Sequence, residues 1–233
     1  MAENKKQKRS RILIYCQGDT EKQYLTSIVK TLKITANVSI RKMLASDLLS
    51  LLKSAYNDFN WSQVVDKQYP FTEYWLIFDC DRHSSYMNIL NLAASIDPKP
   101  HLAWSNPCIE FWFWLHYCCN RKMLMFNEIE ISNVCTEKEL GNDEVEITTV
   151  RRVRRSIRPE TLVKLLQRYL PEYNKATGPI GLIPRSAMAC DNLYKIAQDK
   201  NPKLLGSSIP VLLLRLAKLQ DEIYSPKAQL NTK

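Results

Sequence analysis

Residues 74–81 read Y-W-L-I-F-D-C-D, and this stretch decides the expected fold. The five residues 74–78 are apolar throughout, which is typical of the central strand of a parallel sheet, because such a strand is covered on both faces. Asp79 and Asp81 belong to the D-C-D that follows. The stretch therefore predicts a buried strand with two carboxylates at its carboxyl end.

The segments before this strand alternate between strand-like and helix-like patterns. Residues 11–15 form a short apolar run that stops near Gly18, where a sharp turn is easy, and apolar residues at helical spacing follow. Thr20 is of a residue type that can cap this helix. Residues 37–43 alternate as a strand does, and Ser46 can cap the helix after them. These segments predict two strand-and-helix units.

The segments after the central strand continue the pattern and then become helical. Residues 85–94 predict a helix, residues 101–104 a fourth strand and residues 108–117 an aromatic helix. Residues 127–149 are acidic and irregular. Three further helices are predicted at residues 159–169, 185–198 and 209–224.

Strands that alternate with helices predict an α/β fold with a four-stranded parallel sheet and right-handed crossovers. In such sheets the functional site lies at the carboxyl ends of the strands. The expected organisation is a basic tail at residues 1–10, an α/β core at 11–120, a loop or insertion with a basic cluster at 121–157, and a helical C-terminal region packed on the core at 158–233.

The composition favours a polyanionic partner. The 233 residues carry a formal net charge of +9, which suits nucleic acid or an anionic membrane surface. The longest strongly apolar run, residues 109–119, is too short to span a membrane. Residues 1–10 lack the apolar region of a secretory signal. We therefore expect nucleic acid, and no membrane, as the partner.

The seven cysteines predict a reducing compartment. No C-x-x-C pair occurs, so a zinc ribbon and a thioredoxin-type motif are excluded. Several cysteines lie within apolar segments, as small buried hydrophobic residues do, which indicates a cytoplasmic protein. Only five glycines occur, and this argues against a glycine-rich nucleotide-binding loop.

Asp79 and Asp81 are the first candidate metal ligands. Residues two apart on a strand point to the same side, and two adjacent carboxylates stay ionised at low cost only beside a cation. Oxygen ligands suit Mg²⁺ or Mn²⁺ rather than zinc. A solvated turn, or pairing with Arg82, is the alternative interpretation.

Glu21 and Glu110 are candidates from two other segments. Glu21 follows the first strand, although a glutamate in the first turn of a helix is also favoured by the helix dipole. Glu110 stands among large apolar residues in P-C-I-E-F-W-F-W-L-H, where a carboxylate is costly unless it is paired, acts as a ligand or base, or bonds a backbone group. The neighbouring Trp112, Trp114 and His116 are more typical of a core.

Five arginines within eight residues form a further candidate, which we call the arginine cluster. They are Arg151, Arg152, Arg154, Arg155 and Arg158. Such a cluster is typical of a surface that contacts nucleic-acid phosphates. A solvated face that neutralises the acidic stretch before it is the alternative.

Four segments together resemble the RloB-like family. C-Q-G-D-T-E-K-Q-Y-L at residues 16–25 is similar to the first family motif, and D-C-D at residues 79–81 to its D-x-D. S-N-P-C-I-E-F-W-F-W-L-H-Y at residues 105–117 resembles the most specific family signature. L-P-E-Y-N-K at residues 170–175 resembles its Y-x-K element. A-M-A-C-D-N-L at residues 187–193 and P-V-L-L-L-R-L-A-K-L at residues 210–219 fit the last helices of the family loosely, so the resemblance spans nearly the whole chain.

The resemblance implies a TOPRIM-like fold related to the nuclease domains of OLD-type systems. It implies a divalent-metal-dependent nuclease that cleaves DNA or RNA, tRNA included, as an effector of anti-phage or abortive-infection defence in the bacterial cytoplasm. An ABC- or AAA-type ATPase is the implied partner protein, and a homodimer is left open. Lys175, in the Y-x-K element, is a candidate for stabilising the charge of the transition state.

Gln17 departs from the family pattern, in which a glutamate precedes the glycine. An amide oxygen coordinates a metal weakly and cannot act as a base. Three explanations stay open. Asp19 substitutes for the missing acid, or Glu21 carries the site with the two aspartates and Glu110, or the protein is inactive.

We therefore predict an enzyme that hydrolyses phosphodiester bonds. Glu21, Asp79 and Asp81 would bind Mg²⁺ or Mn²⁺, and Glu110 and Lys175 would complete the catalytic group. One alternative is a catalytically impaired subunit that binds nucleic acid or regulates an ATPase-containing complex. Another is primase-like or nucleotide-processing activity on the same fold.

Overall fold

The fold was obtained as a computed structural model. The residues that it describes are 10–42, 47–67, 69–80, 86–117, 159–175, 186–197 and 206–224. Asp81 and the arginine cluster lie outside the described residues.

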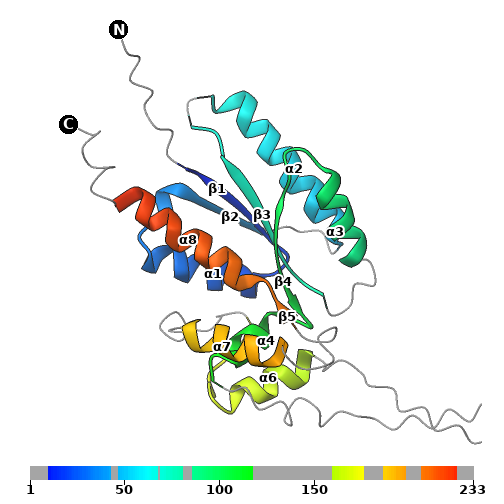
Figure 1. Cartoon of the computed structure of the whole chain (residues 1–233), viewed down its shortest axis with the longest axis vertical. Coiled ribbons are helices and arrows are strands. Elements are labelled where there is room, and N and C mark those ends of the chain that lie inside the picture. The colour runs from blue at the N-terminus through cyan, green and yellow to red at the C-terminus, as the bar shows by residue number, and fades with distance from the viewer. Residues whose placement is uncertain are drawn as a thin grey trace, which may run out of the picture.

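A sheet with four parallel strands forms the centre of the molecule (Figure 1). The strands are β1 (Ile12–Cys16), β2 (Val38–Lys42), β3 (Glu73–Asp79) and β4 (His101–Asn106), and their spatial order is β2-β1-β3-β4. The predicted α/β fold with four parallel strands is confirmed. The longest of these strands, β3, is the one that carries the Y-W-L-I-F run.

A fifth strand was not predicted. Residues Gly206–Ser207 form β5, which pairs antiparallel with the end of β4. The backbone N–H of Ser208 also donates to the Trp104 carbonyl at 2.8 Å. Two residues are too few for a period-two pattern, so only the pairing with β4 defines this strand.

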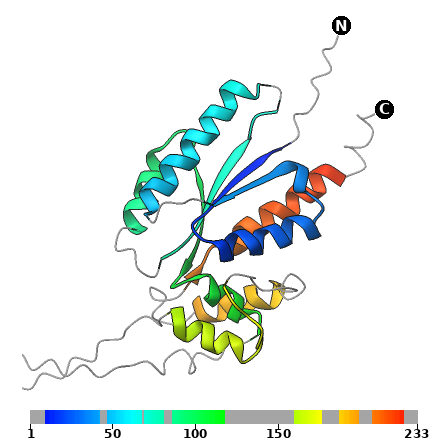
Figure 2. The ribbon, with the colours of Figure 1, turned by 180° about the vertical axis from the view of Figure 1, so that it is seen from behind.

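Two layers of helices cover the two faces of the sheet (Figures 1 and 2). Helices α1 (Asp19–Thr31) and α8 (Ile209–Tyr224) lie on one face, and α2 (Leu48–Val65) and α3 (Tyr86–Ser95) on the other. A short 3-10 helix (Thr35–Asn37) precedes β2. Because both faces are covered, the side chains of β1 and most of those of β3 are buried, which explains why these strands are continuously apolar.

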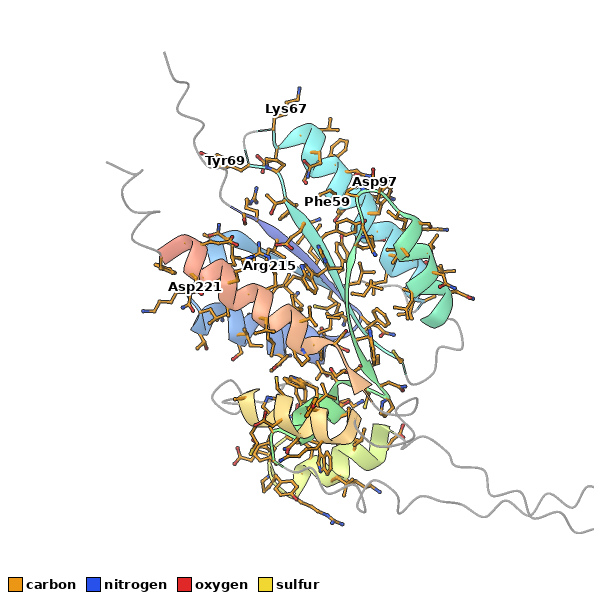
Figure 3. All side chains as sticks on the ribbon, viewed as in Figure 1. Phe59, Lys67, Tyr69, Asp97, Arg215 and Asp221 are labelled. Atoms are coloured by element: carbon orange, nitrogen blue, oxygen red, sulfur yellow. The ribbon has the colours of Figure 1, made fainter. Side chains whose placement is uncertain are left out.

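The alternation of side chains along the strands separates two hydrophobic cores. Ile12 and Ile14 belong to the core beneath α1 and α8, whereas Leu13 and Tyr15 belong to the core beneath α2 and α3. Phe59 of α2, labelled in Figure 3, stacks on a β3 ring in the second core with the ring centroids 4.7 Å apart. The period of two therefore determines which core each strand residue enters.

A third group of helices lies beyond the carboxyl edge of the sheet (Figure 1). It consists of α4 (Ile109–Leu115), α6 (Pro159–Gln167) and α7 (Ser186–Ala197). Trp112 and Trp114 are fully buried, as is His116, whose Nδ1 lies 2.8 Å from the Trp112 carbonyl oxygen. The expectation that these three residues belong to a core agrees with this burial.

The helix caps differ from the sequence-based expectation. Helix α1 begins after Gly18, and Thr20 lies inside its first turn without capping it. The N-cap of α2 is Asp47, whose carboxylate accepts a hydrogen bond from the Ser50 N–H at 2.8 Å. Ser46, the predicted cap, lies outside the described residues. The Thr20 prediction was wrong because its hydroxyl has a distant partner, which is given below.

None of the helices in the described ranges combines the length and the apolar character needed to cross a membrane.

Candidate functional site

The sheet has its topological switch point between β1 and β3. From β1 the chain passes to β2 on one side, and from β3 it passes to β4 on the other. The connections therefore leave in opposite directions above the carboxyl ends of these two strands, where open α/β sheets bind their ligands. Gln17 and Gly18 follow β1 there, and Asp79 ends β3.

Gln17 joins the ends of β1 and β3. Its backbone N–H donates to the Ile77 carbonyl at 3.1 Å, and its side-chain oxygen Oε1 accepts from the Asp79 N–H at 2.9 Å. A glutamate at this position would place a second negative charge beside Asp79. The neutral amide accepts the same hydrogen bond without adding that charge. The departure from the family pattern therefore has a local structural use.

Asp79 joins β3 to the start of α4. Its Oδ1 accepts a hydrogen bond from the backbone N–H of Ile109 at 2.8 Å. The N-cap residue of α4, Cys108, makes no side-chain capping bond. The Asp79 carboxylate, at the end of β3, caps this helix instead. The bond also brings the Asp79 carboxylate close to the first turn of α4, which contains Glu110.

Glu21 is buried, with 4% of its surface exposed, in the first turn of α1. Its carboxylate fills the space beside Gly18, because a Cβ on Gly18 would lie 2.6 Å from Glu21 Oε2. Burial, together with the charge of Glu110, raises the pKa of Glu21 to about 7, although backbone hydrogen bonds and Lys175 oppose this. Glu21 and Glu110 thus repel each other across the site.

Glu110 is 1% exposed and uses its two oxygens differently. Oε1 accepts from the Tyr173 hydroxyl at 3.0 Å and lies 3.3 Å from Lys175 Nζ. Oε2 is buried and has no hydrogen-bond partner among the described residues. A buried carboxylate oxygen without a donor is costly, so this atom is available to a cation or a proton donor.

Lys175 is held by its backbone and by its side chain. Its carbonyl oxygen accepts a hydrogen bond from the Thr20 hydroxyl at 2.9 Å, which is the distant partner of Thr20. Burial lowers the pKa of Lys175, but the charge and hydrogen bond of Glu110 outweigh this and leave the pKa raised. The ammonium group is therefore charged at neutral pH, and its side chain is still 56% exposed.

Tyr173 and Cys108 were not predicted as parts of this site. Burial, and then the charge of Glu110, raises the pKa of both groups, so both remain protonated at neutral pH. Burial and the charge of Glu21 likewise raise the pKa of Cys16. The Y-x-K resemblance contained Tyr173, but no local pattern in the sequence indicates that its hydroxyl reaches Glu110.

Among the predicted site residues, the structure brings Glu21, Asp79, Glu110 and Lys175 to the same edge of the sheet. The charges of Glu110 and Lys175 act on Glu21, and that of Asp79 acts on Lys175. Asp19, the proposed substitute for the missing acid, forms an ion pair with Lys42 instead. The placement of Asp81 and of the arginine cluster is outside the described residues.

The donor chemistry of this group suits a hard divalent cation. Carboxylate oxygens are the preferred protein ligands of Mg²⁺, which often takes one or two of them and completes its shell with waters and substrate phosphates. Within the described ranges, no three His, Cys, Asp or Glu side chains form a metal-binding group. Glu21 and the unpartnered Oε2 of Glu110 fit an ion of this kind in number and type, with the remaining ligands supplied from elsewhere.

The family comparison agrees with these motifs. The family model described as "RloB-like protein" matches residues 12–176. This span begins at the first residue of β1 and ends one residue after Lys175, so it contains the whole group described above. No curated protein and no solved structure matches the chain significantly. Since the family match covers more than two thirds of the 233 residues, the chain belongs to the RloB-like family.

Proposed function

We propose that this protein is a divalent-cation-dependent nuclease that hydrolyses phosphodiester bonds of DNA or RNA. One observation carries the proposal. Asp79 ends β3, and Glu21 and Glu110 lie in the first turns of the helices that follow β1 and β4, so all three lie at one edge of the sheet together with the charged Lys175. Carboxylates that hold a cation, with a lysine for phosphate, are what this reaction requires.

The residues of the chain would divide the work as follows. Glu21 and Glu110, the latter through Oε2, would hold Mg²⁺ or Mn²⁺, with Asp79 and Asp81 as the other candidate ligands. A bound ion would supply Lewis-acid polarisation of the phosphate and an attacking water of lowered pKa. Lys175, whose side chain is half exposed, would contact a phosphate oxygen and stabilise its charge. The arginine cluster would hold the nucleic-acid backbone.

Cleavage assays test this proposal. The purified chain is incubated with DNA, with single-stranded RNA and with tRNA, each with Mg²⁺, with Mn²⁺ or with EDTA. We expect cleavage that needs the cation and that falls by at least about 100-fold in Asp79→Asn and Glu110→Gln. Glu73→Gln is the matched control, because Glu73 lies on the same strand as Asp79 at the opposite edge of the sheet. Equal activity in wild type, Asp79→Asn and Glu110→Gln would refute the proposed metal site.

A non-catalytic role is the second candidate, and Gln17 is the observation that favours it. Its amide replaces the acid of the family motif and is engaged with the Asp79 N–H. In this case the chain would bind nucleic acid, or regulate a partner, without cleaving. Gln17→Glu separates the two candidates, because restored cleavage in this variant alone would show that the wild-type site is impaired.

The proposed cellular context comes from the family resemblance. We propose that the chain acts in the bacterial cytoplasm as an effector of anti-phage defence, with an ABC- or AAA-type ATPase as its partner. Co-purification with the product of a neighbouring ATPase gene, and loss of phage protection in Asp79→Asn, are the expected results. Full protection by that variant would count against nuclease activity as the effector function.

A further inference from the structure

Tyr173 stands in the segment that links α6 to Lys175, and it is fixed by contacts that do not involve Glu110. Its backbone N–H donates to the Leu170 carbonyl at 2.9 Å, and its own carbonyl accepts from Gln167 Nε2 at 3.1 Å. Its ring meets Phe113 edge to face, with the centroids 6.2 Å apart. Only 4% of the residue is exposed. These contacts therefore fix the position of the phenol independently of its hydrogen bond to Glu110.

Glu110 has one fixed partner and one mobile partner. Tyr173 and Lys175 both engage Oε1, at 3.0 and 3.3 Å. The Lys175 side chain is more than half exposed, so it can turn toward a phosphate in solvent. The Tyr173 phenol is buried and cannot reach solvent without unpacking. When Lys175 leaves, the Tyr173 hydroxyl still donates to Oε1, and the Cys108 thiol, a weak donor, is the other described side chain with a hydrogen bond to Glu110.

We infer that Tyr173 is a positioning residue, whose hydroxyl holds Oε1 of Glu110 and thereby presents Oε2 to a divalent cation. The two observations that carry this are the shared Oε1 and the buried, unpartnered Oε2. A hydrogen bond to a ligating carboxylate commonly contributes 10- to 100-fold to metal affinity. Burial and the neighbouring Glu110 raise the pKa of Tyr173, which keeps the hydroxyl a donor at neutral pH.

The inference rests on the proposed function in one respect, namely that this site takes a divalent cation. Its test is Mn²⁺ binding to the full chain, measured by calorimetry without nucleic acid. We expect Tyr173→Phe to bind Mn²⁺ about 10-fold more weakly than wild type, or worse, while its melting temperature stays close to that of the control.

The matched control is Tyr15→Phe. Tyr15 is also buried and its hydroxyl also donates to a carboxylate, that of Asp58, but on the opposite face of the sheet. Both variants remove one phenol oxygen and one bond to an acid. A loss of Mn²⁺ affinity in Tyr173→Phe that Tyr15→Phe lacks supports a positioning role, because a general loss of stability would affect binding in both.

The remaining outcomes distinguish the two proposals. Equal Mn²⁺ affinity in wild type and Tyr173→Phe overturns the role of Tyr173 and leaves the cation site intact. A wild type that binds no Mn²⁺ overturns both. Should Tyr173→Phe fail to fold, Tyr173→Met takes its place, since it also removes the hydroxyl bonded to Glu110 and keeps an apolar side chain at this buried position. Unchanged Mn²⁺ affinity in that folded variant then overturns the inference.

Discussion

At the scale of single residues, the Glu21 carboxylate depends on the absence of a side chain at Gly18. The Glu21 carboxylate occupies the position that a side chain on residue 18 would take, at 2.6 Å from a Cβ. The backbone of Gly18 is extended and any residue could adopt it, so the requirement for glycine is one of space and not of backbone conformation. The glycine of the C-Q-G segment therefore determines where the glutamate three residues later can lie.

Gly18→Ala is expected to disturb the site more than the fold. The Glu21 carboxylate must move away from the added methyl group, whereas the extended backbone accepts alanine at a cost of roughly 1 kcal/mol or less. We expect a clear loss of Mn²⁺ affinity with little change in the free energy of unfolding. Glu21→Asp, alone and combined with Gly18→Ala, is the control, since the shorter acid relieves the contact. If the losses of Mn²⁺ binding free energy in the two single variants simply add in the combined variant, the steric explanation would be contradicted.

The raised pKa of Glu21 predicts how the free energy of unfolding depends on pH in the absence of metal. Burial, and the charge of Glu110, raises its pKa from 4.5 to about 7, so between these values the folded chain binds more protons than the unfolded chain. The resulting stabilisation is complete below about pH 4.5 and is lost as the pH rises through about 7, a difference on the order of 3 kcal/mol.

Urea unfolding in EDTA at about pH 5 and about pH 8 measures this effect. The free energy of unfolding of Glu21→Gln, which cannot ionise, should rise relative to that of wild type between the two pH values. Parallel changes in both proteins would show that Glu21 does not titrate in this range.

Helix α8 shows at the element scale how one face of a helix is fixed to the core. Its buried residues Ile209, Leu212, Leu216 and Leu219 recur at helical spacing and join the core beneath β1 and β3. Arg215, labelled in Figure 3, reaches the sheet, and its Nε lies 2.7 Å from Glu73 Oε1. The family match ends at residue 176, so α8 completes this core from outside the matched span.

Leu216→Ala should therefore destabilise the whole molecule. The side chain is fully buried, and its truncation leaves a cavity that costs about 2–5 kcal/mol. Leu214→Ala is the control on the same helix, because Leu214 is 71% exposed and its truncation should change stability by about 0.5 kcal/mol or less. Equal effects of the two substitutions in urea unfolding would mean that α8 is not packed as described.

Net charge is the property of the whole molecule that bears on substrate binding. The excess of nine positive charges favours any polyanion, but it does not say where the polyanion lies. The site itself is acidic, so a nucleic acid needs cationic contacts around it. The charged Lys175 lies within the site, and the arginine cluster is the predicted surface beyond it.

Nucleic-acid affinity is expected to fall steeply with salt. For duplex DNA, the slope of log K against log salt concentration changes by about 0.9 for each phosphate contact that is lost. Replacing the arginine cluster by glutamines should flatten this slope by several such steps, as measured by fluorescence anisotropy. The control with the same change of charge replaces five exposed lysines outside the proposed site, namely Lys30, Lys33, Lys67, Lys99 and Lys218. An equal slope in both variants would mean that only total charge matters.

The elements of the fold were predictable because they depend on near neighbours. The Y-W-L-I-F run gave β3, and helical spacing gave α8 with both of its ends. Strand β5 and the Asp47 cap were missed, the first because it has two residues and the second because several residues nearby can cap a helix. Local patterns therefore sufficed wherever a segment was long and periodic.

The sequence by itself determined the α/β class, the strand ends that carry acids, and the candidates Glu21, Asp79, Glu110 and Lys175. Only the tertiary structure decided how they are used. Asp79 caps α4, Tyr173 holds Glu110 across 63 residues, and the Thr20 hydroxyl reaches Lys175 across 155 residues instead of capping its own helix. The physical reason is the sequence separation of the interacting residues. Periodicity reflects the burial of side chains that are near neighbours in the sequence. A hydrogen bond between distant segments forms only after the sheet and helices have packed.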